Sequence, residues 1–425
     1  MFMLNIGHRK GLLSSLDIVQ GATILPSGNN YISLANRPPL EAKRIMFDPQ
    51  LYLSDLEVIE CKNVCARLAS YPYFNVPDIP NILDYSGDMK GYKKEILDKI
   101  GNLWNKKRLD DIHVVCRRAI GLQLDIPCTH IILPCPAIRE REDEAKIQAD
   151  WLDEAIDAAD ELLVGQPLLA TVAIWDTELK ENSFKENGFL DTVVDQISSR
   201  EGIDGVYMVI IQNNKDHPFK MSPLITRAYF HLCNAFGKIG YDTIYPNFAD
   251  VLGLICLGLG ATDVGTGQSF KLRKMSITSF KDSAFGKSFP HYYSHKAMTE
   301  FRSGIDLQNI VEKKLVGRIT DITPFSQSLI NELRRPNGLA SNLPSWVESQ
   351  NNTTTAHKHF LYRLAKEVKR LNNMDIPSRQ ILLRDQLESA AANTLFIKRR
   401  FGKENKIKGN INPAEKWLDL YDPYI

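Results

Sequence analysis

Two stretches of the chain decide its fold class: LLATVAI at Leu168 to Ile174 and GVYMVII at Gly205 to Ile211. Both are unbroken apolar runs rich in β-branched residues, which is typical of parallel strands covered on both faces. Similar short segments recur along the first two thirds of the chain, with helical patterns between them. These segments are Ala22 to Leu25, Arg44 to Phe47, His130 to Leu133, Asp242 to Tyr245, Ala261 to Val264 and Lys274 to Thr278.

This alternation of eight candidate strands with helices predicts an α/β fold, specifically a (β/α)8 TIM-type barrel. A long gap after the second candidate strand predicts a helical insertion at about residues 54–126. Beyond residue 290 the sequence shows helical spacing without a strand signal. We therefore expect a barrel over residues 1–290 and a helical C-terminal region over 291–425, which contains a basic segment at 398–408.

The composition indicates a folded protein without a strong overall charge. The 425 residues include 52 Lys or Arg and 51 Asp or Glu, so any nucleic-acid binding must be local. The odd number of cysteines, seven, suits reduced thiols better than a disulfide framework. The longest apolar run, Val251 to Leu259, is too short for a membrane span, and the first residues lack a signal-peptide pattern. We expect a cytoplasmic protein with no membrane partner.

Barrel enzymes place their active sites where the strands end, so the residues after each candidate strand are candidate site residues. Asp48 is the most suggestive, because Pro49 fixes the chain so that the carboxylate points from the strand end. Such a carboxylate can act as a nucleophile, as a general base or as an acceptor for the amidine edge of a base. An Asp-Pro turn is the structural alternative. The other polar candidates are Gln50, Asp176, Gln212, Asn213, Asn247 and Asp263.

The segment around Asp263 is the best candidate for an anion site. Gly265 and Gly267 would let backbone N–H groups approach an anion. Phosphate sites in barrels are often built from the loops after the last two strands, and a tight turn is the alternative explanation for the glycines. The polar and basic residues that would complete this site are Gln268, Lys271, Arg273 and Lys274.

The spacing of possible metal ligands is poor. Cys61 and Cys65 have no second pair, and His291 and His295 lack the Glu of a His-Glu-x-x-His motif. We expect neither a metal nor a cofactor. The basic segment could contact nucleic-acid phosphates or serve as a solvated helix end. Its cations are Lys398, Arg399, Arg400, Lys403, Lys406 and Lys408.

The order of these segments resembles that of tRNA-guanine transglycosylases and their DNA-modifying relatives, over about residues 20–280. The resemblance implies that Asp48, followed by Gln50, contacts the base, and that Asp263 is the nucleophile. The chain departs from the family at Pro49-Gln50-Leu51-Tyr52, where the family has Gly-Gly-Phe-Gln. The family's clustered zinc ligands have no counterpart here.

Three functions remain open on the sequence. The first is base exchange or cleavage of the glycosidic bond in tRNA or DNA, with Asp48 and Asp263 as catalytic residues. The second is a barrel enzyme that acts on a small phosphorylated metabolite. The third is a barrel without catalytic activity that binds a protein or nucleic-acid partner in a multi-protein system or forms a homo-oligomer.

Overall fold

A computed structural model describes most of the chain. The described residues are 1–7, 18–29, 31, 34, 42–54, 56, 60–74, 112–139, 142–213, 218–281, 288–350, 352–401 and 413–425. Part of the expected insertion, residues 75–111, therefore lies outside the described residues, as do Lys403, Lys406 and Lys408 of the basic segment.

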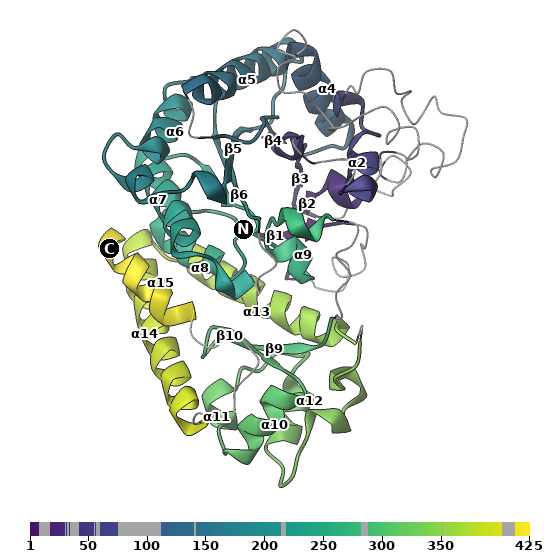
Figure 1. The fold of residues 1–425 in the computed structure, drawn as a ribbon, viewed down its shortest axis with the longest axis vertical. Helices are drawn as coiled ribbons and strands as arrows, with labels where there is room; N and C mark the ends of the chain where they lie inside the picture. The colour runs from purple at the N-terminus through teal and green to yellow at the C-terminus, as the bar shows by residue number, and fades with distance from the viewer. Residues whose placement is uncertain are drawn as a thin grey trace, which may run out of the picture.

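The described residues form an α/β protein with two four-stranded parallel sheets (Figure 1). The first sheet has the order β3-β2-β1-β8, and the second has the order β4-β5-β6-β7. The strands of the first sheet are β1 (Phe2–Ile6), β2 (Gly21–Ile24), β3 (Arg44–Phe47) and β8 (Val264–Gly267). Those of the second are β4 (Ile131–Ile132), β5 (Leu168–Trp175), β6 (Gly205–Ile211) and β7 (Thr243–Pro246).

Backbone hydrogen bonds join the two sheets through their outermost strands on both sides. The N–H of Thr129, just before β4, donates to the carbonyl of Ile45 in β3 over 2.8 Å. The N–H of Thr262, just before β8, donates to the carbonyl of Ile244 in β7 over 3.0 Å. The eight strands of these two sheets therefore run in one direction, with one edge where they begin and one where they end. We call these the amino edge and the carboxyl edge.

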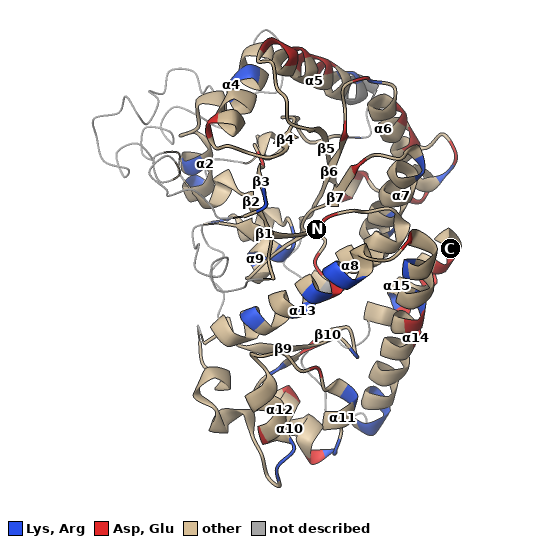
Figure 2. Cartoon of the chain, turned by 180° about the vertical axis from the view of Figure 1, so that it is seen from behind, with Lys and Arg blue, Asp and Glu red and all other residues tan. Residues whose placement is uncertain are grey.

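Helices surround the strands in an arc (Figure 1). They are α2 (Lys62–Leu68), α4 (Ile112–Asp125), α5 (Glu142–Glu161), α6 (Phe189–Ser198), α7 (Pro223–Ile239) and α8 (Leu252–Cys256), while the short α9 (Phe270–Arg273) follows β8. Local sequence explains the ends of α7: the Ser222 side chain accepts a hydrogen bond from Ile225 N–H, and Gly240 has a φ of 92°. The acidic face of α5 lies on the outside of the arc (Figure 2).

The C-terminal region is not purely helical, which corrects the sequence prediction. An antiparallel hairpin pairs β9 (His291–Ser294) with β10 (Thr299–Arg302). Tertiary packing explains why the sequence did not reveal it, because the Tyr293 ring packs edge-on against Phe360 of an adjacent helix. The helices are α10 (Ile305–Glu312), α11 (Val316–Ile319), α12 (Gln327–Leu333), α13 (Thr354–Asn372), α14 (Ile376–Phe401) and α15 (Pro413–Tyr421).

The hydrophobic core has two clusters that share two long helices. The larger cluster fills the strand region and includes Leu364 of α13 and Leu387 of α14. The smaller cluster surrounds the hairpin and includes Ala356 of α13 and Ile397 of α14. The larger cluster also includes Tyr293, Met298 and Trp417, so the C-terminal region contributes to both cores. Among the described residues, no helix has the length and apolarity needed to cross a bilayer.

Six of the eight predicted strands are present in the structure. The other two predictions were wrong, and one strand was missed. β1 was missed, and Lys274 to Thr278 is not a strand, although Ser276 forms an isolated parallel bridge with Gln212. The segment predicted at Ala261 to Val264 is displaced, because β8 begins at Val264. This displacement moves Asp263 from the end of the predicted strand to the position just before the observed one.

Candidate functional site

A buried carboxylate, Asp48, lies at the carboxyl edge directly after β3. Its Oδ2 accepts hydrogen bonds from the Tyr52 and Tyr207 hydroxyls at 2.5 and 2.6 Å. Its Oδ1 accepts one from the Gln50 backbone N–H at 3.0 Å. The side chain has no solvent exposure. Burial without such donors would be costly for a charged carboxylate, so the three donors explain how this position is tolerated.

The hydrogen bonds continue from Asp48 across both sheets. Asn247, which follows β7, donates from Nδ2 to the Tyr207 hydroxyl at 2.7 Å. The Tyr245 ring packs edge-on against Tyr207, and its hydroxyl lies 2.7 Å from Thr23 Oγ1 in β2. We call these six residues, Thr23, Asp48, Tyr52, Tyr207, Tyr245 and Asn247, the Asp48 network. It brings together polar groups from β2, β3, β6 and β7.

Gln50 supplies an unused donor beside this network. Its backbone is left-handed, with a φ of 54°, which turns the chain back over β3 after Pro49. The side-chain Oε1 accepts a hydrogen bond from Ser27 N–H at 2.8 Å, so the amide orientation is defined. Among the described residues, Nε2 has no hydrogen-bond acceptor, although Gln50 is only 1% exposed. This donor therefore has capacity for one further acceptor.

Burial, partly offset by its three donors, raises the pKa of Asp48 to about 6. Burial and the adjacent Asp48 charge raise the pKa of the Tyr207 hydroxyl well above its usual value, so this tyrosine stays protonated as a donor. A carboxyl group with a pKa near 6 can both accept and release a proton close to neutral pH. The network therefore has the acidity that acid–base catalysis requires.

This raised pKa predicts a pH-dependent stability. The unfolded carboxyl group titrates near 3.8 and the folded one near 6, which corresponds to about 3 kcal/mol. Because the folded state binds the proton more tightly, stability falls as the pH rises through this window. Urea unfolding of wild type and Asp48→Asn between about pH 4 and 7 should show the wild type losing about 3 kcal/mol relative to the variant. A constant difference over this range would contradict the assignment.

A second carboxylate, Asp176, lies at the same edge after β5. It is half-buried, and its Oδ2 accepts a hydrogen bond from Asn213 N–H at 3.3 Å. Among the described residues Oδ1 has no hydrogen-bond partner. Burial raises the pKa of Asp176, and the charge of the buried Lys274 acts in the opposite direction. Asp176 is thus a carboxylate with one buried oxygen that has no hydrogen-bond partner among the described residues, and with a nearby cation.

Gln212 connects this edge to the segment after β8. Its backbone N–H donates to Met275 and its carbonyl accepts from Ile277, both at 2.9 Å. The structure thus places Asp48, Gln50, Asp176, Gln212, Asn213 and Asn247 at the carboxyl edge, as the sequence predicted.

Asp263 does not join them, and this prediction was wrong. Asp263 precedes β8, and its Oδ2 forms an ion pair at 2.6 Å with Arg44, the first residue of β3. Its Oδ1 lies 2.9 Å from the α-amino group of Met1. All three groups lie at the amino edge, at the opposite end of the strands from Asp48. Asp48 and Asp263 therefore cannot act on one substrate atom as a pair.

The glycines after Asp263 serve packing rather than anion binding. A Cβ on Gly265 would lie 2.1 Å from Asn247 Oδ1 and 2.4 Å from the Tyr245 hydroxyl. A Cβ on Gly267 would lie 2.1 Å from the Cβ of Leu272. Gly265 thus makes room for the Asp48 network, which corrects its predicted role at an anion site.

The cations of this segment do not come together at one anion site either. Arg273 is buried and forms ion pairs with Asp250 and Glu300. Lys274 is buried near Asp176, whereas Lys271 is exposed. Gln268, also predicted to take part, is half-buried before α9.

This chain matches no protein-family model, no curated protein and no solved structure. Its function must therefore be inferred from its own residues.

Sequence reasoning missed the tyrosines of the Asp48 network. Tyr207 and Tyr245 lie inside strands, where an aromatic residue usually indicates apolar core. Tyr52 lies four residues after Asp48 in the 3-10 turn Leu51–Leu53. One signal was available: tyrosine in an otherwise aliphatic buried strand needs a partner for its hydroxyl.

The described residues contain no group of three or more His, Cys, Asp or Glu side chains placed to hold a metal ion. All seven cysteines are buried in the core, and none of them forms a disulfide. At the end of α14, Lys398, Arg399 and Arg400 are exposed.

Proposed function

We propose that the eight strands form a (β/α)8 barrel with its functional site at the carboxyl edge. The strand order supports this, because the N–H groups of Thr129 and Thr262 donate to carbonyls of β3 and β7 and so link the outermost strands of the two sheets on both sides. The Asp48 network supports it too, since its hydrogen bonds cross between the sheets. In such barrels the carboxyl edge carries catalysis and the amino edge carries stability.

We further propose that this site exchanges or cleaves the bond between a base and its sugar in nucleic acid. The observation that carries the proposal is the pairing of Asp48 with Gln50. Oδ1 of Asp48 has accepted one hydrogen bond and has capacity for a second, and the Gln50 amide has a free donor. A nucleobase edge presents a donor beside an acceptor, which matches these two groups.

Asp48 then provides the proton. As the bond between the sugar C1′ and the base nitrogen breaks, its electron pair leaves with the base, which takes a proton from the Asp48 carboxyl group. An incoming base returns a proton to Asp48 when the new bond forms. The pKa of about 6 suits both directions near neutral pH.

Asp176 takes the role that the sequence assigned to Asp263. Its buried Oδ1, which has no hydrogen-bond partner among the described residues, stabilises the positive charge that develops at C1′, or attacks this carbon to form a covalent intermediate. The half-buried Trp175 beside it offers a face on which a base can stack.

The test uses purified protein with RNA and DNA oligonucleotides and an isotopically labelled free base. Mass spectrometry measures both base release and label incorporation. We expect activity in the wild type and a loss of about 100-fold or more in Asp176→Asn. Asp195→Asn, a matched change at an exposed site on α6, should retain full activity. Equal rates in the two variants would remove Asp176 from the mechanism, and an inactive wild type would refute the proposal.

One observation favours a second candidate, a barrel that binds a partner without catalysis. Asp48 is fully buried and both of its oxygens have donors, as in a purely structural network. This candidate predicts nucleic-acid or protein binding in a wild type that neither releases nor exchanges a base. The small-metabolite alternative loses its main support, which was the predicted anion site. Arg273 is already paired with carboxylates, and side chains of neighbouring residues occupy the space beside Gly265.

A further inference from the structure

A basic pocket lies far along the chain from the Asp48 network, between the end of α10 and the end of α14. Its volume is about 520 Å³. The lining contains four cations and no acid, together with Leu315, Gly317 and Phe396. The cations, which define what we call the basic pocket, are Lys313, Lys314, Arg318 and Arg400.

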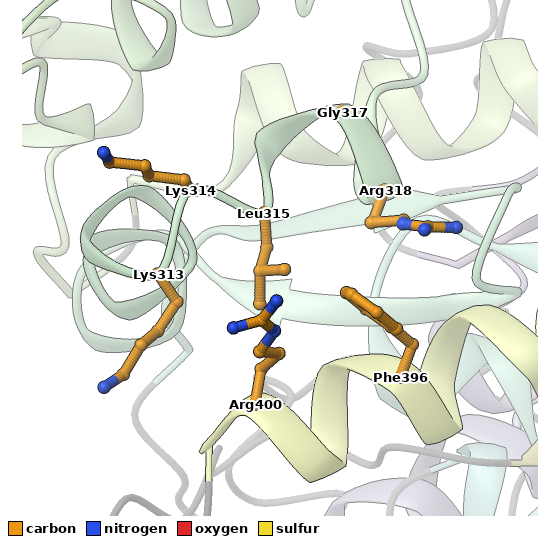
Figure 3. A pocket seen from close by; sticks show the side chains of 7 residues that line it. All are labelled: Lys313, Lys314, Leu315, Gly317, Arg318, Phe396 and Arg400. Atoms are coloured by element: carbon orange, nitrogen blue, oxygen red, sulfur yellow. The ribbon is translucent and has the colours of Figure 1, made fainter.

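The side chains are arranged around one aromatic ring. The guanidinium of Arg318 lies 4.4 Å from the centroid of Phe396, and that of Arg400 lies 5.6 Å from it. Arg400 extends from α14 towards Leu315, while Lys313 and Lys314 spread outwards on one side (Figure 3). Two guanidinium groups thus lie beside the apolar Leu315 and Phe396, and two flexible ammonium groups extend from the rim of the pocket.

These cations are not neutralised within the described part of the chain. Arg318 donates one hydrogen bond to the neutral Asn393, at 3.3 Å. No ion pair with a described residue involves Lys313, Lys314, Arg318 or Arg400. By contrast, the buried Arg273 has two carboxylate partners. Unpaired cations gathered in a pocket favour an anionic ligand.

The cations could instead be present because they stabilise the C-terminal ends of two helices. The size of the charges involved decides between this explanation and an anionic ligand. α10 ends at Glu312 and α14 at Phe401, and cations near helix C-termini are favourable. Each helix end carries only about half a negative charge, so two ends amount to about one. Four full positive charges exceed this. The pocket therefore keeps a net positive potential for a ligand.

We propose that the basic pocket binds the phosphate backbone of a nucleic-acid strand. Lys398 and Arg399, also exposed at the end of α14, add positive charge to this end of the helix but do not line the pocket. The forked donors of Arg318 and Arg400 suit phosphate oxygens, and the Phe396 ring holds both guanidinium groups beside one another. This inference rests on the proposed function in naming nucleic acid, and it assigns the binding surface.

The experiment compares two triple variants of the full chain. The fluorescence anisotropy of a labelled oligonucleotide measures its affinity for each variant over a range of salt concentrations. The pocket variant combines Lys313→Gln, Lys314→Gln and Arg400→Gln. The control combines Lys238→Gln, Lys366→Gln and Lys416→Gln, three exposed lysines without ion pairs to described residues. Both variants lose three positive charges. A difference between their affinities therefore reports where the charges lie on the protein, not the change in net charge.

We expect the pocket variant to reduce the slope of log affinity against log salt by about 2 to 3, and to weaken binding to every sequence alike. The control should leave the slope close to that of the wild type. Equal effects of the two triples, or a wild type without salt-dependent binding, would overturn the proposal. Inorganic phosphate or polyglutamate that competes as well as an oligonucleotide of equal charge would overturn the assignment to a strand.

The inference and the proposed function fail separately. Asp48→Asn should keep the wild-type salt slope, because Asp48 is not part of the basic pocket. If the pocket variant loses affinity while the wild type shows no base chemistry, the binding surface stands and the catalytic proposal falls. If the wild type exchanges bases and the pocket variant binds normally, only the pocket is refuted.

Discussion

Asp48→Asn is expected to lower the rate of base exchange or release by about 100- to 10,000-fold, the usual contribution of a positioned acid–base group. The substitution keeps the shape of the side chain and can accept hydrogen bonds from Tyr52 or Tyr207 through its oxygen. It removes the titrating group whose pKa lies near 6. The measurement is the rate at saturating oligonucleotide, together with its pH profile below about pH 7.

Asp263→Asn is the matched control for this experiment. Asp263 is also a fully buried aspartate, but it lies at the amino edge, where it pairs with Arg44. We expect this variant to lose stability while its rate per folded molecule stays within about twofold, because Asp263 pairs with Arg44 at the opposite end of the strands from the proposed site. A large loss of rate in Asp263→Asn with normal activity in Asp48→Asn would reverse the placement of the active site.

Arg273→Met is expected to destabilise the protein by about 3–5 kcal/mol, the cost of leaving buried charges without their partner. Arg273 is 2% exposed and holds Asp250 through two hydrogen bonds, at 2.9 and 2.8 Å. A third, at 2.6 Å, reaches Glu300 in β10, and the guanidinium stacks 3.9 Å from the Phe360 ring centroid in α13. One side chain thereby joins the strand region to the hairpin and to α13.

Urea unfolding provides the measurement, and two further variants separate the causes. Arg335→Met removes an ion pair from a side chain that is 72% exposed, so it should cost less than about 1 kcal/mol. The triple change Asp250→Asn, Arg273→Met and Glu300→Gln removes all three charges and should restore part of the loss. A cost below about 1 kcal/mol for Arg273→Met alone would show that the buried charges are relieved in another way.

Several features of the fold could be predicted from local sequence. β3 and β6 have the predicted bounds, because β-branched and aliphatic runs between polar residues leave little choice of structure. The position of Asp48 at the carboxyl edge followed directly from the predicted end of β3. These features depend on short-range preferences, and the structure confirmed them.

The position of β8 could not be predicted, because half of its residues have a low propensity for strands. Val264–Gly267 contains two glycines, which weaken a strand when considered alone. Here the glycines are needed, since Asn247 and Tyr245 occupy the space of a side chain at Gly265. The preceding residues looked more like a strand, and this small displacement placed Asp263 at the wrong edge.

The sequence by itself determined an α/β protein with parallel strands, and it placed Asp48 and Asp176 where strands end. Only the tertiary structure decided which polar groups meet. It brought the hydroxyl groups of Tyr52 and Tyr207 to Asp48, placed Asp263 at the far end, and gathered the basic pocket from α10 and α14. The physical reason is that periodicity along a chain reports the local conformation, whereas hydrogen bonds and ion pairs between distant segments depend on how strands and helices pack.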